Sequence, residues 1–294
     1  MSTPAADAAR IAGRRFVVTG ASSGLGLAAA RALARGGARV VLAVRDVTAG
    51  ERVAAELGGS TEVRALDLAD LGSVRRFAES WDGDLDVLIN NAGVGNLPKR
   101  RVTADGFELQ MGTNHFGHFA LTNLLLPHIT DRVVTVASNA HRSGGIDLAD
   151  VNWESRPYRV FASYGQSKLA NLLFTLELQR RLVACGSPVL ALAAHPGVAA
   201  SNLVRDLPAA LVVAAKVVGT VVRQSAEAGA APTLFAATRD LPGASYVGPG
   251  GFNEMRGRPT LVGRSPEAAD PDLARDLWTL SEKLTGVTFP LGSA

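Results

Sequence analysis

The chain is predicted to form one α/β domain in which helices cover both faces of a doubly wound parallel sheet. Short runs rich in β-branched residues alternate with stretches of helical periodicity along its 294 residues. These runs lack the alternation of polar and apolar residues, which is typical of strands buried on both faces. Because 47% of the residues are hydrophobic and no stretch resembles a linker, the chain can bury one large core.

Six strands are expected in this sheet, with helices of about 10 to 25 residues between them. The expected strands are residues 16–19, 39–44, 63–66, 87–90, 132–137 and 189–193. Clear helices are residues 24–35, which Gly36 and Gly37 end, and residues 71–81. Thr48 and Glu51 form a capping box that predicts the start of the helix after the second strand. A last surface helix is expected over residues 270–284.

Two longer segments, residues 139–160 and 201–226, interrupt this alternation. Loops that follow the carboxyl ends of parallel strands line the ligand crevice, so both segments are expected to form substrate walls. The second segment is rich in leucine and valine, which favours a hydrophobic substrate. The alternatives for that segment are a packed helix or a contact between subunits. Residues 1–12 are expected to be flexible.

Composition excludes several classes of function. Lys and Arg exceed Asp and Glu by only 30 − 27 = 3, without a concentrated basic tract, so no nucleic-acid partner is expected. The apolar stretch 207–222 contains Lys216 and is shorter than the roughly 20 residues that span a bilayer. Residues 1–10 do not resemble a signal peptide, and the single Cys185 cannot form an internal disulfide. A cytoplasmic protein without a transmembrane segment is expected, and the histidines show no metal-ligand spacing.

Tyr164 and Lys168 form the most informative pair in the chain. Residues four apart lie on one face of a helix, so the ammonium of Lys168 is expected beside the phenol of Tyr164. A cation about 4 Å away could lower a phenol pKa of about 10 by roughly three units, toward the range useful for acid/base chemistry. The alternative is an exposed helix pair without chemistry.

A glycine-rich turn follows the first expected strand and opens the first helix. Glycines at such a junction let the backbone approach a pyrophosphate, whose charge is held by free N–H groups of the helix. The turn comprises Gly20, Ser22, Ser23, Gly24, Leu25 and Gly26. Residues 20–24 also match the nucleophile elbow of serine hydrolases, but a hydrolase serine would follow several strands rather than the first one.

Together these motifs resemble the short-chain dehydrogenase/reductase family, which implies a Rossmann-type fold. The resemblance covers about residues 13–203 and rests on order and spacing. Its elements are residues 19–26, residues 90–93, Asn114, Ser138, Tyr164 with Lys168, and Pro196 with Gly197. Residues 105–108, 112–119 and 164–171 are similar to the branch of the retinol dehydrogenases and protochlorophyllide reductases.

The resemblance implies a role for each of four residues. Tyr164 would exchange a proton with the substrate oxygen, and Lys168 would lower its pKa and bind the nicotinamide ribose. Ser138 would hold the substrate carbonyl, and Asn114 would anchor a water molecule on a proton path to Lys168. Taken singly, Ser138 could be only a strand-end hydroxyl and Asn114 only a polar helix residue.

The resemblance also implies the cofactor contacts. Asn91, Ala92 and Gly93 would lie near the adenosine and ribose, Asp67 and Leu68 near the adenine, and Pro196, Gly197, Val198 and Ser201 near the nicotinamide. Asp67 could equally be a turn or capping residue. The second strand ends at Val44, so Arg45 with Ser22 is expected to bind a 2′-phosphate, and Asp46 is expected in the following turn. NADP(H) is therefore predicted over NAD(H).

The predicted activity is hydride transfer between NADP(H) and a small hydrophobic ketone, aldehyde or alcohol. The alternative is an NADP(H)-binding sensor or scaffold without turnover, and a light-driven pigment reductase is a further possibility within the same branch. Residues 109–127 and 169–183 could pair between subunits to make a homo-oligomer, or could remain on the surface of a monomer. His141 is expected to be an exposed loop residue, and His195 to support the turn at Pro196.

Overall fold

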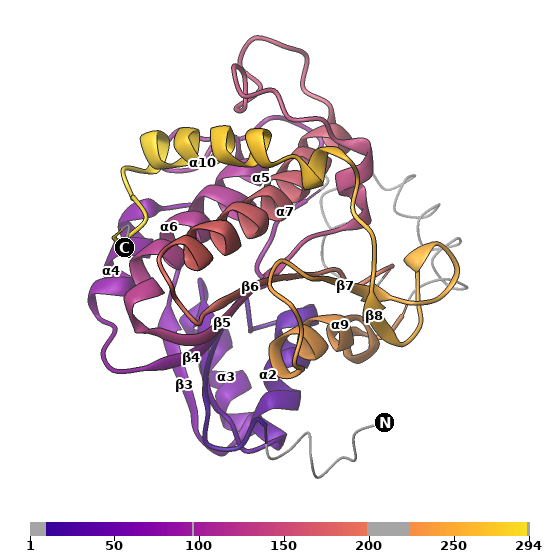
Figure 1. The fold of residues 1–294 in the computed structure, drawn as a ribbon. Coiled ribbons are helices and arrows are strands. Elements are labelled where there is room, and N and C mark those ends of the chain that lie inside the picture. Colours follow the sequence, from indigo (N-terminus) through magenta and orange to yellow (C-terminus); the bar gives the residue numbers. More distant parts are fainter. Residues whose placement is uncertain (1–9, 96, 199–223, 293–294) are drawn as a thin grey trace.

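A mostly parallel sheet forms the centre of the protein in the computed structural model, which describes residues 10–95, 97–198 and 224–292. Its strands are β1 (Arg15–Thr19), β2 (Arg39–Val44), β3 (Thr61–Ala65), β4 (Leu85–Asn90), β5 (Ile129–Val136), β6 (Leu190–Ala194), β7 (Tyr246–Pro249) and β8 (Pro259–Leu261). Their order is β3-β2-β1-β4-β5-β6-β7-β8, and β8 runs antiparallel to β7 (Figure 1). The reversal of strand order at β1 and β4 confirms the predicted doubly wound fold.

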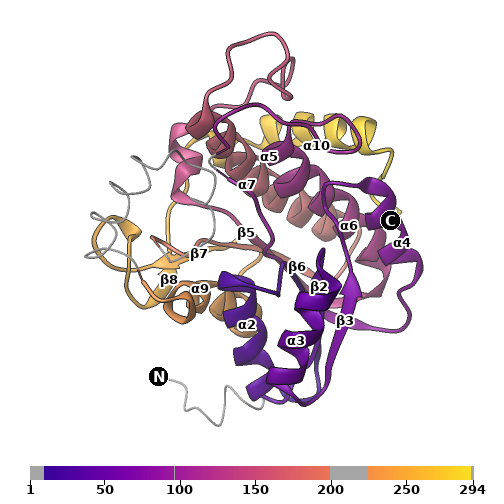
Figure 2. The same cartoon turned by 180° about the vertical axis from the view of Figure 1, so that it is seen from behind.

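Helices cover both faces of this sheet (Figures 1 and 2). One layer contains α4 (Leu71–Glu79), α5 (Leu109–Met111), α6 (Gly117–Leu125), α7 (Val160–Ala184) and α10 (Pro271–Thr285). The other contains α2 (Gly24–Arg35), α3 (Val47–Leu57) and α9 (Ala226–Thr238). None of the helices in the described parts of the chain combines the length and apolar character that a membrane span requires.

The start of α3 corrects one sequence-based expectation. The helix begins at Val47, and its N-cap is Asp46, whose carboxylate accepts a hydrogen bond from the N–H of Ala49 at 2.9 Å. Thr48 is therefore a residue of the first turn rather than the cap. Both residue types can cap a helix, and the point at which β2 leaves the sheet selects the earlier one.

The strands β7 and β8 were not expected from the sequence. They contain four and three residues, too few for a periodic pattern, and β7 ends in Pro249. Val247 pairs with Leu261, so the edge of the sheet is formed by a short hairpin. The six expected strands are confirmed, with ends that differ by a few residues.

Helix α10 covers the outer side of α6 and α7. Trp278 stacks on Phe174, with ring centroids 5.7 Å apart, and meets Phe119 edge-on at 4.8 Å. The guanidinium of Arg181 lies over the same indole, 4.5 Å from its centroid. This packing occupies part of the surface through which α6 and α7 would pair between subunits, which was one of the two alternatives for these helices.

The expected substrate segment 139–160 divides into two parts. A 3₁₀ turn, η3 (Asn139–Ser143), lies against α7, and the remaining residues project as a loop beside α5 and α7 (Figure 1). The loop is held by Gln166, whose Nε2 donates to the carbonyl of Val151 at 2.8 Å, and by Asn152, whose Oδ1 accepts from the N–H of Glu108 at 3.0 Å. Most of the second segment, residues 201–223, lies outside the described residues.

Two glycines bring η3 into direct backbone contact with α7. A Cβ atom on Gly144 would lie 2.3 Å from the carbonyl carbon of Gly165 and 2.4 Å from the nitrogen of Gln166. Neither neighbour is a flexible side chain, so no adjustment of rotamers can relieve the overlap. The close approach places the segment after Ser138 directly against the helix that carries Tyr164.

Replacing Gly144 with Ala is expected to lower the free energy of unfolding by about 1–3 kcal/mol, because the methyl group forces η3 away from α7. Chemical denaturation followed by circular dichroism measures this loss. Gly145→Ala is the matched control, since nothing lies within 4 Å of its Cβ position. Equal stabilities of the two variants would contradict the tight contact.

Candidate active site

The glycine-rich turn after β1 has the geometry of an anion-binding loop. Gly20 and Gly24 have positive φ angles of 68° and 57°, which favour glycine. A Cβ atom on Gly26 would lie 2.5 Å from both the carbonyl oxygen of Gly20 and the Nδ2 of Asn91. Since α2 starts at Gly24, its first N–H groups have no helical carbonyl to bind. The turn, with Ser22, Ser23 and Leu25, fits the pyrophosphate of a nicotinamide dinucleotide.

Thr19 connects this turn to the segment that follows β4. Its Oγ1 accepts hydrogen bonds from the N–H groups of Asn91 and Ala92, both at 2.9 Å. Asn91 also donates from Nδ2 to the carbonyl of Thr19 at 2.8 Å. The predicted contacts of Asn91, Ala92 and Gly93 therefore lie beside the glycine-rich turn.

His118 extends this connection to Asn114. Its Nδ1 lies 3.0 Å from the carbonyl oxygen of Asn114, and its Nε2 lies 2.9 Å from the Oγ1 of Thr19. A carbonyl can only accept, so Nδ1 carries the proton and Nε2 accepts the proton of the threonine hydroxyl. Burial lowers the pKa of His118 to about 4, which keeps the ring neutral in this network. The role of His118 was not predicted, although the residue lies within a motif on which the family resemblance rests.

Asn114 lies in a π-helical turn, η1 (Gly112–Phe116), between α5 and α6. Its Oδ1 accepts from the N–H of Val94 at 2.8 Å, and its Nδ2 donates to the carbonyl of Val94 and to the Oγ of Ser167, both at 2.9 Å. A Cβ atom on Gly93 would lie 3.2 Å from Asn114 Oδ1 and 3.6 Å from Lys168 Nζ. A side chain at position 93 would therefore crowd Asn114 and contact Lys168, so glycine lets the segment after β4 lie close to both predicted site residues.

Ser138 and Tyr164 meet where β5 ends. The Ser138 hydroxyl accepts from the N–H of Ala140 at 3.2 Å as the N-cap of η3, and the same side chain lies close enough to Tyr164 to lower the pKa of its phenol. Burial raises the pKa of Tyr164 to about 12, and the nearby Ser138 side chain only partly opposes this rise. The phenol is therefore fully protonated at neutral pH.

Lys168 lies on the same face of α7, one helical turn after Tyr164. Its Nζ donates to the carbonyl of Val136 at 3.0 Å and lies 5.7 Å from the centroid of the Tyr164 ring. Burial lowers the pKa of Lys168 to about 8. The expectation that the phenol pKa lies below its ordinary value is wrong, because burial disfavours the charged phenolate and raises the pKa.

Arg45 and Asp46, the two residues that could discriminate between NADP(H) and NAD(H), have different surroundings at the end of β2. Arg45 directly follows the strand and is exposed. Asp46 is exposed as well, but its carboxylate caps α3. Asp67 forms a turn in which its Oδ1 accepts from the N–H of Ala69 at 2.9 Å, while Leu68 is buried under Gly117.

The segment after β6 is supported by a buried histidine, as predicted. The N–H of Gly197 donates to Nδ1 of His195 at 3.2 Å, and Pro196, Gly197 and Val198 follow in a turn with a φ angle of 65° at Gly197. Ser201 lies outside the described residues.

His141 is completely buried, so its expected exposure is wrong. Its Nδ1 donates to the carbonyl oxygen of Ser138 at 2.7 Å, and its Nε2 accepts from the N–H of Ser265 at 3.1 Å. The ring meets Tyr246 edge-on, 5.7 Å between centroids, and His195 packs on another side of Tyr246 at 5.1 Å. Sequence reasoning missed Tyr246 because its strand is too short for a periodic signal.

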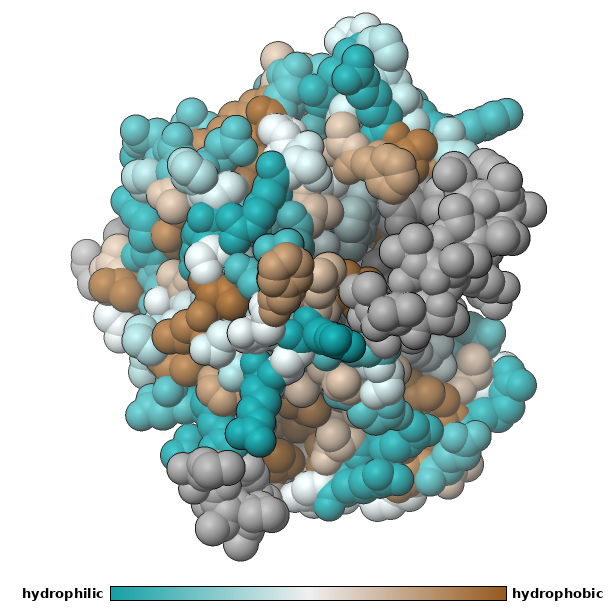
Figure 3. Space-filling model, turned by 90° about the vertical axis from the view of Figure 1, so that its right-hand side faces the viewer, coloured by the Kyte–Doolittle hydropathy of each residue, from teal (hydrophilic) through white to brown (hydrophobic). Residues whose placement is uncertain are grey.

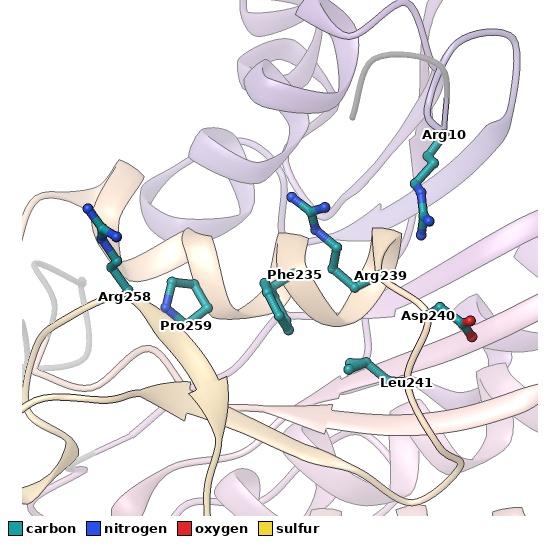
Figure 4. A pocket seen from close by; sticks show the side chains of 7 residues that line it. All are labelled: Arg10, Phe235, Arg239, Asp240, Leu241, Arg258 and Pro259. Atoms are coloured by element: carbon teal, nitrogen blue, oxygen red, sulfur yellow. The ribbon is translucent and has the colours of Figure 1, made fainter. Parts of the chain in front are cut away.

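A pocket of about 540 Å³ lies elsewhere, between the outer side of α9 and the β8 edge (Figure 4). It contains none of the four residues predicted to be catalytic, and its lining consists of Arg10, Phe235, Arg239, Asp240, Leu241, Arg258 and Pro259. The polar residues at the carboxyl ends of β1, β4, β5 and β6 are the better candidate for the active site than this pocket, because they are mostly buried and converge.

Comparison with known proteins agrees with this geometry. The family profile for short chain dehydrogenases matches residues 14–211. The chain is 40% identical to human retinol dehydrogenase 13 over 96% of its length and 87% of the relative, and 41% identical to human retinol dehydrogenase 12 over 95% and 89%.

Two solved structures are also similar. A crystal structure of an uncharacterised protein from Mycobacterium paratuberculosis has 54% sequence identity and a TM-score of 0.84, covering 97% of this chain and 98% of that one. A structure described as an NAD(P) dependent gluconate 5-dehydrogenase from Beutenbergia cavernae with bound NADP has 30% identity and a TM-score of 0.61, covering 78% and 90%.

Burial of His118 in its neutral form is expected to make the protein sensitive to acid. Its pKa is 6.5 when exposed and about 4 in the folded protein, so the unfolded state binds the proton first and stability falls as the pH decreases through this range. Between pH 6.5 and pH 4 the wild type should lose about 3 kcal/mol more unfolding free energy than His118→Gln. Denaturation at several pH values measures the difference.

The accessible His128 supplies the control for this measurement. It lies in the turn η2 (Leu126–His128), where its Nδ1 is 3.2 Å from the carbonyl oxygen of Gly83. His128→Gln should retain the pH dependence of the wild type. Parallel pH profiles for the wild type and His118→Gln would contradict the neutral buried histidine.

Proposed function

The chain belongs to the short-chain dehydrogenase/reductase family, and from this premise we propose that it is an NADP(H)-dependent oxidoreductase acting on hydrophobic carbonyl compounds or alcohols. The family and the retinol dehydrogenase relatives establish the general class of reaction, oxidoreduction of an alcohol or carbonyl group with NAD(P). The observation that carries the more specific proposal is the proximity of Ser138 to Tyr164, with Lys168 on the same helix face as the tyrosine.

Tyr164 is proposed to act as the general acid in carbonyl reduction. When bound, the nicotinamide supplies the hydride that adds to the carbonyl carbon. The carbonyl oxygen then gains negative charge, and Tyr164 donates its O–H proton to that oxygen. A phenol with a pKa of about 12 is protonated at neutral pH and available for this step.

Ser138 and Lys168 are proposed to stabilise the charges that arise. The Ser138 hydroxyl lies close to Tyr164 and would hold the substrate oxygen beside it. Once Tyr164 has lost its proton, the positive charge of the nearby Lys168 ammonium stabilises the phenolate. Asn114, which lies near Gly93 together with the ammonium of Lys168, would hold a water molecule through which Lys168 exchanges protons.

NADP(H) preference is proposed because Arg45 is exposed directly after β2, where its guanidinium can pair with a 2′-phosphate. The carboxylate of Asp46 is already used in capping α3, which makes it a poor partner for a ribose 2′-hydroxyl. Ser22, in the glycine-rich turn, would add a hydroxyl contact. A bound NADP in the related Beutenbergia structure supports the same choice.

The names of the relatives support a hydrophobic substrate, since retinol is an apolar alcohol with a long carbon skeleton. The competing interpretation is a cofactor-binding sensor without turnover. It offers no physical reason for keeping a buried tyrosine and a buried lysine beside a partly buried serine, because burial of such polar groups is costly.

Tyr164→Phe is expected to abolish turnover by at least about a thousandfold, because the proton donor is lost, while NADPH binding is unchanged. Turnover is followed by NADPH absorbance with a panel of hydrophobic aldehydes and ketones, and binding by fluorescence titration. Tyr158→Phe is the control and should remain active, because the hydroxyl of Tyr158 hydrogen-bonds Glu108 and Gln110 and has no proposed role in proton transfer. A Tyr164→Phe enzyme with normal turnover would refute the acid role.

Arg45→Ala is expected to reduce the preference for NADPH over NADH by roughly 10- to 100-fold, the value of one charge-assisted contact with phosphate. The measurement is the ratio of kcat/KM for the two cofactors. Arg39→Ala removes an exposed arginine at the opposite end of β2 and serves as the control. An Arg45→Ala ratio equal to that of the wild type would exclude this residue from cofactor choice.

A further inference from the structure

The hairpin between β7 and β8 has a strained tip. Its base is closed by hydrogen bonds from the N–H of Gly250 to the carbonyl of Arg258 at 2.8 Å and from Gly251 to Arg256 at 3.0 Å. At the tip, Asn253 and Glu254 have consecutive positive φ angles of 48° and 56°. Asparagine tolerates this conformation, whereas glutamate rarely adopts it. Strain of this kind persists only where the surrounding contacts impose it.

The contacts that hold Glu254 are made by its carboxylate. Oε2 accepts a hydrogen bond from Nε2 of His195 at 3.0 Å, and Oε1 lies 3.5 Å from the guanidinium of Arg142. His195 is only 1% exposed, and its Nδ1 accepts from the N–H of Gly197. The neutral ring therefore carries its proton on Nε2, which directs a donor at Glu254. The carboxylate joins the hairpin to the segment after β6.

The tip also bridges two segments of the candidate active site. The carbonyl of Met255 accepts from the N–H of Val198 and from Nε2 of Gln224, both at 2.9 Å. On its other side, the carbonyl of Asn253 lies 3.4 Å from Nδ2 of Asn139, the residue that follows Ser138. The hairpin thus contacts both the serine segment and the turn proposed to hold the nicotinamide.

Phe252 stands at this bridge with 79% of its surface exposed. The hairpin lies at the β8 edge, the side of the molecule that faces the viewer in Figure 3. Hydrophilic and hydrophobic side chains are intermixed over the described surface on this side (Figure 3). Hydrophobic residues that are exposed singly are common and need no explanation. Phe252 differs from them, because it lies on a strained hairpin tip beside the candidate active site.

We propose that the tip of this hairpin is a wall of the substrate site, that Phe252 contacts the apolar chain of the substrate, and that Glu254 is a positioning residue acting through His195. The inference rests on the proposed function and deepens it, because it assigns the preference for long, apolar carbonyl compounds to one residue. A longer apolar substrate covers more of the phenyl ring and gains more from the contact.

The first test compares butanal, octanal and dodecanal as substrates with NADPH. Phe252→Ala is expected to lower the ratio of kcat/KM for dodecanal to that for butanal by about tenfold. Leu261→Ala is the matched control, since it truncates another exposed apolar residue, 53% exposed, on the adjoining strand β8. A ratio in Phe252→Ala equal to that in Leu261→Ala overturns the inference. A wild-type protein that reduces none of these aldehydes overturns the proposed function itself.

The second test separates positioning from stability. Glu254→Gly removes the carboxylate but suits the left-handed backbone, so the backbone strain is relieved. It should raise KM for dodecanal by about tenfold, with kcat and the Kd for NADPH within about twofold of the wild type. Glu254→Gln keeps an oxygen that can accept from His195 and should restore most of the KM. If Glu254→Gly has the KM of the wild type, or if Glu254→Gln has that of Glu254→Gly, Glu254 is not a positioning residue.

Discussion

The hydroxyl group of Thr19 binds together the segments from which the candidate site is built. It accepts hydrogen bonds from the N–H groups of Asn91 and Ala92 after β4 and donates one to His118. The other ring nitrogen of His118 donates to the carbonyl of Asn114. Loss of this hydroxyl would leave several buried groups without partners, each at a cost of about 1–3 kcal/mol. The glycine-rich turn, the segment after β4 and the π-helical turn are therefore positioned as one unit.

Burial determines the protonation of this unit more strongly than charge does. It raises the pKa of Tyr164 and lowers those of Lys168, His118 and His195. For His195 the carboxylate of Glu254, 3.0 Å away, favours the protonated ring, yet its hydrogen bond from Gly197 requires an unprotonated Nδ1. The neutral form agrees with both bonds. A protonated phenol close to an ammonium then provides a proton donor whose anion is stabilised once it forms.

The sequence predicted the elements well where a local signal marks their ends. The predicted helix 24–35 and strand 39–44 match α2 and β2. Gly36 and Gly37 end the helix, and the strand begins two residues later. Local signals failed where two were in competition or where none existed. Asp46 rather than Thr48 caps α3, and β7 and β8 depend on pairing between segments too short to show periodicity. His141 was misjudged because its burial comes from Tyr246 and Ser265, far along the chain.

By itself, the sequence determined the α/β class with its parallel doubly wound sheet, the positions that only glycine can occupy, and the order of the residues proposed for chemistry. These properties follow from backbone preferences and spacing, which are local. Only the tertiary structure decided which groups are neutral, how Thr19 and His118 link the cofactor turn to Asn114, and that the hairpin tip at Glu254 meets the segments of Ser138 and Gly197. The reason is that desolvation and hydrogen bonding depend on every atom around a group, and most of those atoms belong to distant segments.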